Sequence, residues 1–162
     1  MNININSLSQ KYSVQKLDEN DVDIIYDMSC KNDIFYQYHP PFVTRESILD
    51  DMEALPPGKD YDDKFYVGFF ENDSLVGLMD LILDYPNKEI AFIGLFMTDT
   101  RYQNRGVGSQ IISDMIPCLK SYGYQEIQLG VDKGNPQSYS FWTKNKFTPI
   151  REDTYILMVL RI

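Results

Sequence analysis

The chain has 162 residues, enough for one domain with a sizeable hydrophobic core. Its 15 basic and 24 acidic side chains give a net charge of −9, which argues against nucleic-acid binding through charge and would suit a cationic partner. Two cysteines without CxxC spacing, a single histidine, no signal-like N-terminus and no apolar run near ~20 residues lead us to expect a reduced cytoplasmic protein with no metal site and no membrane partner.

The first 64 residues carry signals for one strand and two helices. Residues 12–17 are interpreted as the strand, and residues 18–30 as a helix that begins with an N-cap-rich acidic turn. The aromatic segment 35–42 contains a Pro-Pro pair and is interpreted as a loop, whereas residues 44–55 open with Thr and Ser and form a short helix. Residues 60–64 are charged, and we expect them to be mobile.

The remaining chain alternates strand and helix signals. We expect strands over residues 65–70, 75–83, 89–98, 125–131, 147–150 and 155–162, and helices over residues 107–122 and 136–144. The first two of these strands flank a hairpin turn at residues 71–74. The longer helix carries apolar residues at steps of four, although Pro117 should kink it or end its regular part early. The last strand lacks polar alternation, so both of its faces should be covered.

This order of elements is not that of a doubly wound fold. It favours an α/β fold of the α+β type, with a mixed, mostly antiparallel central sheet of six or seven strands and helices on both faces. Residues 1–162 are expected to form a single domain.

A turn rich in backbone donors lies where the strand ending at residue 98 gives way to the longer helix. Its residues are Gln103, Asn104, Arg105, Gly106, Val107, Gly108 and Ser109. A helix N-terminus leaves N–H groups without intrahelical acceptors, and glycine lets a bulky anion approach them. The segment is therefore a candidate pyrophosphate site. It lacks the Gly-Lys-Ser/Thr ending of a P-loop and the third glycine of the dinucleotide fingerprint.

Two motifs together resemble those of the GNAT superfamily of N-acyltransferases. The turn matches the acyl-CoA signature Q/R-x-x-G-x-G/A, and residues 93–98 look like the strand that precedes it in that family. Farther along, the segment from Asn135 to Phe147 is similar to the family's second cofactor motif, N-x-x-A-x-x-F-Y-x-K-x-G-F. The resemblance covers residues 65–150 well and the first 60 residues only by element order.

The resemblance implies an acetyl-CoA or coenzyme A site without metal. The turn 103–109 would bind the pyrophosphate, and the backbone of Phe96, Met97 and Thr98 would lie beside the pantetheine arm. A backbone N–H at or near Met97 would stabilise the oxyanion. Three further contacts are expected: Asn135 with an arm amide, Trp142 with the thiol end, and at least one of Arg101, Arg105 and Lys144 with a phosphate.

The chain departs from the family pattern at three positions. Trp142 stands where the family has its tyrosine acid, and an indole N–H does not protonate a thiolate. Tyr139, one turn earlier, is the candidate replacement, with packing as the alternative. Phe92 stands where some members place a glutamate base. Lys146 replaces a glycine, a change that matters only if the position needs positive φ.

Other groups could serve as the base. Glu89 should point to the other face of the sheet, and Asp80 and Asp84 on the preceding strand are candidates, although solvated surface charges are the simpler interpretation. A water chain leading to bulk solvent is an alternative.

We expect an N-acetyltransferase that moves an acetyl group from acetyl-CoA to a primary amine of a small molecule or peptide, by direct attack on the thioester. The alternative is a non-catalytic acyl-CoA-binding sensor or regulatory module, and a nucleotide-binding protein of another fold is a third possibility. Aromatic residues of the early loop would line the acceptor pocket or simply anchor that loop: Phe35, Tyr36, Tyr38, His39 and Phe42. The apolar last strand could serve a homodimer or an interior position in the sheet.

Overall fold

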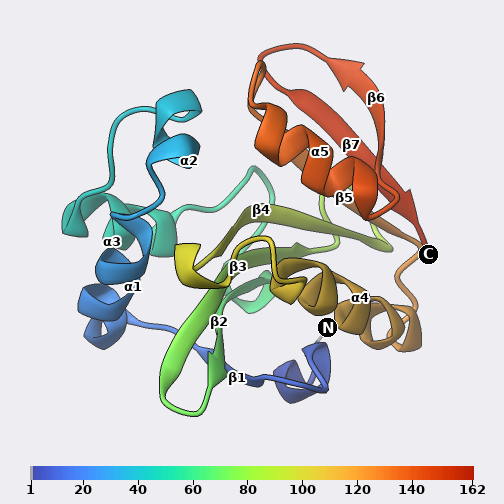
Figure 1. The fold of residues 1–162 in the computed structure, drawn as a ribbon. Coiled ribbons are helices and arrows are strands. Elements are labelled where there is room, and N and C mark those ends of the chain that lie inside the picture. Colours follow the sequence, from blue (N-terminus) through green and yellow to red (C-terminus); the bar gives the residue numbers. More distant parts are fainter. Residues whose placement is uncertain (1) are drawn as a thin grey trace.

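A computed structural model describes residues 2–162 and contains one seven-stranded sheet flanked by helices (Figure 1). The strands are β1 (Ser13–Lys16), β2 (Lys64–Glu71), β3 (Ser74–Leu83), β4 (Ile90–Thr98), β5 (Glu126–Val131), β6 (Thr148–Glu152) and β7 (Ile156–Arg161). The α-helices are α1 (Val22–Ser29), α2 (Asp33–Tyr38), α3 (Arg45–Glu53), α4 (Val107–Ser121) and α5 (Pro136–Lys144). Short 3₁₀ helices cover Ile5–Leu8, Glu19–Asp21, Tyr61–Asp63 and Thr100–Tyr102.

The sheet is mostly antiparallel, as the sequence predicts. Its strand order is β1-β2-β3-β4-β5-β7-β6, and every neighbouring pair is antiparallel except β4 and β5. The last strand in sequence, β7, takes an interior position between β5 and β6. Its consecutive residues Leu157, Met158 and Val159 are all buried, which confirms that both faces of this strand are covered.

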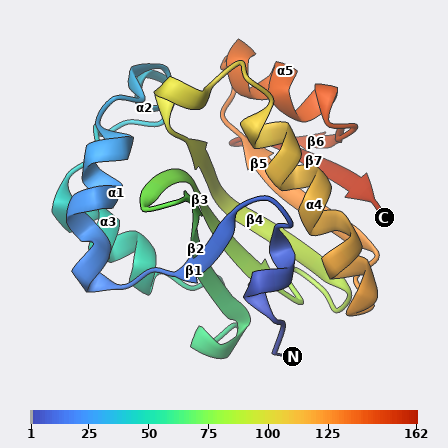
Figure 2. The same ribbon diagram turned by 60° about the horizontal axis from the view of Figure 1, so that its bottom comes forward.

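Helices cover both faces of the sheet (Figure 2). On one face, α1 and α3 bury Ile25 and Ile48 against β2 and β3. On the other face, α4 packs on the central strands and α5 adds Trp142 to the same cluster. Two separate layers of apolar side chains thus hold a single sheet between them.

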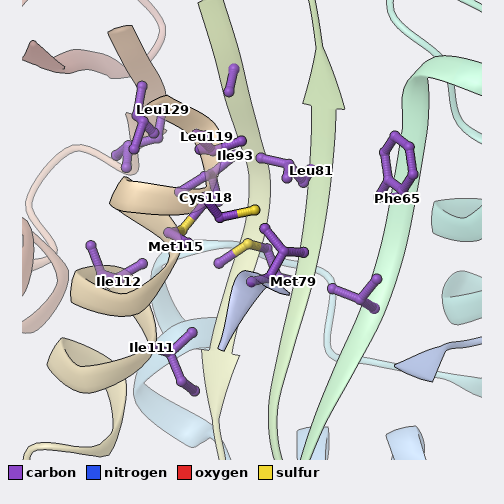
Figure 3. Packing of buried hydrophobic residues seen from close by; sticks show 14 of the residues in the cluster. Phe65, Met79, Leu81, Ile93, Ile111, Ile112, Met115, Cys118, Leu119 and Leu129 are labelled. Carbon is purple, nitrogen blue, oxygen red and sulfur yellow. The ribbon is translucent and has the colours of Figure 1, made fainter. Parts of the chain in front are cut away.

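The packing of α4 follows the four-residue spacing in its sequence. Figure 3 shows Ile111, Met115 and Leu119 on the side of α4 that faces the strands, close to Met79 and Ile93. These side chains are at most 3% exposed. Burial of a side chain of this size contributes about 1.5–3 kcal/mol to folding, so this stripe fixes the position of α4 and hence of its N-terminus.

The parallel pair β4–β5 separates halfway along its length. Its ladder begins at Ile90 and Glu126 and ends at Ile93 and Leu129, although β4 continues to Thr98. Opposite the end of the ladder, β4 has an extra residue, Gly94, between the partners of Asp80 and Leu81. A bulge of this kind bends a strand and increases its twist. The C-terminal half of β4 therefore presents one backbone edge to a gap rather than to a neighbouring strand.

The structure departs from the sequence interpretation of local structure at three places. The segment interpreted as a loop at 35–42 begins with α2, because the Pro-Pro pair follows this helix rather than interrupting it. Of the two outcomes expected for Pro117, an early end of the helix is wrong, because α4 contains Pro117 and runs on to Ser121. Residues 61–63, expected to be mobile, form a 3₁₀ helix capped by the Asp60 side chain.

Candidate functional site

A cavity of about 590 Å³ lies where the open edge of β4 meets the N-terminus of α4 and one side of α5. The structure brings twelve of the thirteen predicted cofactor residues to its wall: Phe96, Met97, Thr98, Gln103, Asn104, Gly106, Val107, Gly108, Ser109, Asn135, Trp142 and Lys144. The thirteenth, Arg105, is exposed and does not line the cavity. Residues from positions 96 to 144 thus converge on one concave surface.

The N-terminus of α4 offers a cluster of free backbone donors to this cavity. Gly106 caps the helix with φ +79°, a left-handed conformation that glycine adopts without strain. The first helical bond runs from Gln110 N to Gly106 O at 2.9 Å. Within residues 2–162, the amides of Val107, Gly108 and Ser109 consequently have no hydrogen-bond acceptor. Together with the helix dipole, they form a site suited to an anion.

The Gln103 side chain positions this turn. Its Nε2 donates to Asn32 Oδ1 at 2.8 Å and to Thr98 O at 3.3 Å. Asn32 is buried between α1 and α2, and its Nδ2 also donates to Thr98 O, at 3.3 Å. These bonds tie the turn to the end of β4. The sequence analysis missed Asn32, because its partner Gln103 is 71 residues away and no local motif marks the contact.

Close packing between α4 and α5 explains the second glycine. A Cβ atom at Gly108 would lie 2.9 Å from Cε1 of Phe141 and 3.5 Å from Cε2 of Phe96. Beyond this contact, Asn145 Nδ2 donates to Ser109 Oγ at 3.1 Å. The absence of a side chain at position 108 lets α5 lie directly against the first turn of α4.

The backbone of β4 alternates between its two edges. Asp99 N donates to Val76 O at 2.9 Å, which makes this a hydrogen-bonded pair of the antiparallel ladder. Two and four residues earlier, Met97 and Leu95 therefore also direct their N–H groups toward β3. The N–H groups of Phe96 and Thr98 face the gap instead. The sequence expectation placed the oxyanion donor at or near Met97, and this register favours its two neighbours.

Trp142 forms the wall at the inner end of the cavity. Its ring is buried and lies 5.7 Å from Phe96, 4.9 Å from Phe141 and 5.0 Å from Phe147, measured between ring centroids. Asn135 caps α5 through its side-chain oxygen, which accepts from Ser138 N at 3.1 Å. The side-chain amide nitrogen of Asn135 makes no hydrogen bond within the described chain and is available to a ligand.

The structure does not bring Tyr139 to the site. Its side chain is 38% exposed and lines neither of the two cavities described here. Each helical residue advances about 100° around the axis, so Tyr139 lies about 60° from Trp142 on the side opposite to Phe141. The three-residue spacing behind the prediction was sound, but the direction of rotation carries the hydroxyl away from the cavity.

A second cavity of about 480 Å³ lies beyond Trp142, between α2, α3 and the diverging strands. Four residues line both cavities, namely Phe35, Phe96, Ser138 and Trp142, so the two meet at this point. Of the five aromatic and histidine residues named for an acceptor pocket, Phe35, Tyr36 and His39 line the second cavity, whereas Tyr38 and Phe42 do not. His39 Nδ1 lies 3.1 Å from the Asp132 carboxylate at the rim.

The candidate bases differ in whether they line a cavity. Glu89 and Asp84 line neither cavity, and Phe92 lines the second. Asp80 also lines the second cavity, where its Oδ2 accepts from Lys64 Nζ at 2.7 Å. Burial raises the pKa of the Asp80 carboxyl, and the hydrogen bond from Lys64 offsets this only in part. The interpretation of Asp80 as a solvated surface charge is therefore wrong.

The basic residues near the turn have different surroundings. Arg101 forms two side-chain hydrogen bonds with Asp99, at 3.1 and 3.0 Å, so its guanidinium is already paired. Lys144 lines the first cavity from the end of α5.

Among residues 2–162, no cluster of three or more His, Cys, Asp or Glu side chains could hold a metal ion. No helix in this range is long and apolar enough to cross a membrane.

Comparison of the fold with solved structures gives several similar proteins. An acetyltransferase from Thermus thermophilus has a TM-score of 0.81 at 19% identity, covering 94% of this chain and 97% of that one. The PaiA N-acetyltransferase of Thermoplasma acidophilum, solved in complex with coenzyme A, has a TM-score of 0.68 at 16% identity, with 93% and 99% covered. The ribosomal-protein-S18-alanine N-acetyltransferase of Escherichia coli has a TM-score of 0.66 at 15% identity, with 93% and 94% covered.

Comparison of the sequence gives a family assignment. No curated protein matches the chain significantly. Residues 29–147, most of the chain, match the model of the family described as "Acetyltransferase (GNAT) family". This range includes β4, the donor-rich turn, α4 and α5, the elements that build the first cavity. The chain belongs to the GNAT acetyltransferase family.

Proposed function

We propose that the protein is an N-acetyltransferase that moves an acetyl group from acetyl-CoA to a primary amine. The observation that carries this proposal is the set of free amides at Val107, Gly108 and Ser109, directly beside the open edge of β4. The free amides would bind a diphosphate, and the open edge of β4 would bind an amide-containing arm. Coenzyme A carries both groups next to each other. Acyl transfer is the activity that family membership supports, and the acetyl donor and amine acceptor are our proposal.

The residues of the first cavity fit coenzyme A. The diphosphate would accept hydrogen bonds from the first turn of α4, with Lys144 close to its phosphates. The pantetheine amides would pair with the backbone of Phe96 and Thr98, as an added strand pairs with a sheet edge. The Asn135 side-chain amide would donate to the same arm. Arranged in this way, the thiol end reaches the junction of the two cavities at Trp142.

The chain's own groups then have defined roles in the transfer. The Phe96 or Thr98 N–H would donate to the carbonyl oxygen as negative charge develops on it, a contribution of several kcal/mol in comparable sites. The acceptor amine would approach from the second cavity and attack the thioester carbon directly. No nucleophilic side chain of the protein is needed, so the reaction would form no acyl-enzyme intermediate. Trp142 would pack beside the leaving sulfur and exclude water there.

A non-catalytic acyl-CoA-binding module is the second candidate. Trp142 stands where relatives would supply a tyrosine hydroxyl, and Tyr139 does not reach the site. This observation favours a sensor, because the residue beside the proposed thiol end carries an indole, which does not protonate a thiolate. A sensor binds the thioester but releases no thiol when amines are added.

Trp142 provides a direct binding assay, because it is the chain's only tryptophan and lines the cavity. Titration with coenzyme A should change its fluorescence, and ATP should not produce the same saturable change. Equal responses to the two ligands would contradict the acyl-CoA assignment. Thiol release from acetyl-CoA is then measured with a panel of diamines, amino sugars, amino acids and peptides. Saturable binding without any amine-dependent release would favour the sensor.

We also propose that residues 1–162 act as one domain. Strands from both ends of the chain, β1 and β7, belong to the same sheet, and the cavities draw residues from positions 32 to 155. The acceptor would be a small molecule or a peptide end, since a cavity of about 480 Å³ admits groups of that size. Homodimerisation and a cytoplasmic location stay predictions.

A further inference from the structure

The second cavity has a carboxyl group close to the junction with the first. Asp80 on β3 is the direct cross-strand partner of Leu95, one residue from Phe96, which lines both cavities. Gly94 allows this approach, because a Cβ there would lie 3.3 Å from Asp80 Oδ2. Neighbouring strands lie about 4.8 Å apart, so Asp80 is one strand away from the edge of β4 proposed for the thioester, and both Asp80 and Phe96 line the second cavity.

The Asp80 carboxyl is incompletely paired. Its Oδ2 accepts from Lys64 Nζ at 2.7 Å, but its Oδ1 is buried and has no hydrogen-bond partner within the described chain. The side chains of Lys64 and Asp80 are only 4% and 14% exposed. Buried polar atoms are nearly always hydrogen-bonded, so a carboxyl that lines a cavity with one free oxygen lacks a donor. A protonated amine in the cavity would supply this donor once rotation of the carboxyl turns Oδ1 toward it.

The charges around the cavity favour a positive ligand. Three carboxylates line it, those of Asp51, Asp80 and Asp132, against one lysine that bonds Asp80 and one histidine at the rim. With His39 counted as neutral, the formal total is therefore −2. Aromatic side chains on α2 and β4 also line the cavity and can contact the aliphatic part of such a ligand.

We propose that the second cavity binds the acceptor as a small aliphatic amine with a second positive charge, and that Asp80 accepts the proton its ammonium group loses before attack. This inference rests on the proposed acetyl transfer. Asp51, on α3 beside Lys64 and Asp80, would attract the second charge. Asp80 would thus be a catalytic residue on β3. It would take the place of the glutamate base that the chain lacks on β4.

The proton balance of this step is complete. The ammonium gives one proton to the Asp80 carboxylate, which becomes a neutral carboxylic acid. The amine nitrogen attacks the acetyl carbon, so a C–N bond forms and the C–S bond breaks. The second nitrogen proton passes to the leaving sulfur, directly or through a water molecule. Asp80 then releases its proton to solvent, and each turnover yields an N-acetyl amide, a thiol and one proton.

The burial of the Asp80 carboxyl supports its role as the proton acceptor. Burial raises the pKa of the Asp80 carboxyl, which makes the carboxylate a stronger base than a surface aspartate. The titratable groups that face it are Lys64 and Tyr66 on β2 and Asp51 on α3, whereas its β4 neighbours, Gly94 and Leu95, do not titrate. The hydrogen bond and positive charge of Lys64 oppose the effect of burial on the pKa of Asp80, and the same charge partly offsets the burial that raises the pKa of Asp51.

The first test compares Asp80→Asn with Asp84→Asn, a matched change on a partly exposed residue that lines neither cavity. With 1,4-diaminobutane, Asp80→Asn should lower kcat about 100-fold or more at pH 7, the usual contribution of a general base. Its remaining rate should rise about tenfold per pH unit toward the amine pKa near 10, because solvent must now remove the proton. Coenzyme A affinity, read from Trp142 fluorescence, should stay within twofold. Asp84→Asn should match the wild type.

A structural role for Asp80 makes a different prediction. Asp80→Asn leaves Lys64 buried without its partner, so loss of activity could reflect misfolding. The double variant Lys64→Met/Asp80→Asn removes both charges together. Recovery of kcat in the double variant, or a kcat of Asp80→Asn within threefold of wild type, would overturn the catalytic assignment. Persistent loss in a folded double variant that still binds coenzyme A supports it.

The charge preference is tested with three amines of similar length. The ratio kcat/KM should fall in the order 1,4-diaminobutane, n-pentylamine and 4-aminobutyrate, and Asp51→Asn should lower it for the diamine alone. Equal use of 4-aminobutyrate would overturn the cationic acceptor. Thiol release with no amine at all would contradict the proposed function and this inference with it. Release that is unaffected by Asp80→Asn or Asp51→Asn would overturn this inference alone.

Discussion

Replacement of Gly108 by alanine should disturb the contact between α4 and α5. The new Cβ would lie 2.9 Å from Cε1 of Phe141 and 3.1 Å from its Cζ. The shorter distance is about 0.6 Å below the ~3.5 Å at which carbon–carbon contacts become favourable, so the ring must move. Trp142, 4.9 Å away between ring centroids, opposes that movement.

The expected loss of stability follows from two opposing effects. Overpacking of this kind costs about 1–3 kcal/mol, whereas alanine improves helix propensity by up to about 1 kcal/mol relative to glycine. Subtracting the full propensity gain leaves a net destabilisation of roughly 0–2 kcal/mol. In a chain of this length, that corresponds to a fall in Tm of up to about 8 °C. Coenzyme A affinity should also fall, because the displaced ring forms part of the cavity wall.

A double-mutant cycle with Phe141→Leu tests the cause directly. Leucine is smaller than phenylalanine and can yield to the new methyl group, so Gly108→Ala should cost at least ~1 kcal/mol less in the Phe141→Leu background. Urea denaturation followed by circular dichroism measures all four proteins. Equal costs of Gly108→Ala in the two backgrounds would refute the steric explanation.

Four further changes have defined outcomes. Gly106 has φ +79°, so Gly106→Ala should cost about 1–2 kcal/mol in urea denaturation and Gly106→Asn less. Lys146 has φ +75°, a conformation that glycine adopts without strain, so Lys146→Gly should raise the midpoint rather than lower it. Burial opposes ionisation of Asp99, but hydrogen bonds from Arg101 hold its pKa below the usual range. This stabilisation is present above the unfolded-state pKa of ~3.9 and is lost as pH falls through the lower pKa of the folded state. Arg101→Met should therefore be less stable than wild type at pH 7, and the difference should shrink as pH falls below ~3.9. Tyr139→Phe should leave turnover unchanged, and a large loss would restore Tyr139 as the acid.

Local patterns in the sequence were sufficient to predict the element that carries the site. The four-residue apolar spacing of α4 and the two glycines before and within its first turn depend only on neighbouring residues. The signals for α5 are equally local, since Asn135 caps it as predicted. The fold class, the mostly antiparallel sheet and the interior last strand follow from the order and composition of these elements.

The errors concern relationships that local patterns do not contain. The Gln103–Asn32 contact joins segments far apart in sequence. Burial of Asp80 depends on α3 and on the bulge at Gly94, neither of which strand alternation reveals. Tyr139 lies three residues before Trp142, which places it about 60° from Trp142 around the helix axis. This rotation is enough to move a side chain from the cavity to solvent.

A crystal structure with bound coenzyme A tests the central claim most directly. The account predicts diphosphate oxygens about 2.7–3.2 Å from the amide nitrogens of Val107 and Gly108, with the pantetheine arm along Phe96 and Thr98. A diphosphate bound elsewhere, with these amides hydrated or paired within the protein, would contradict it.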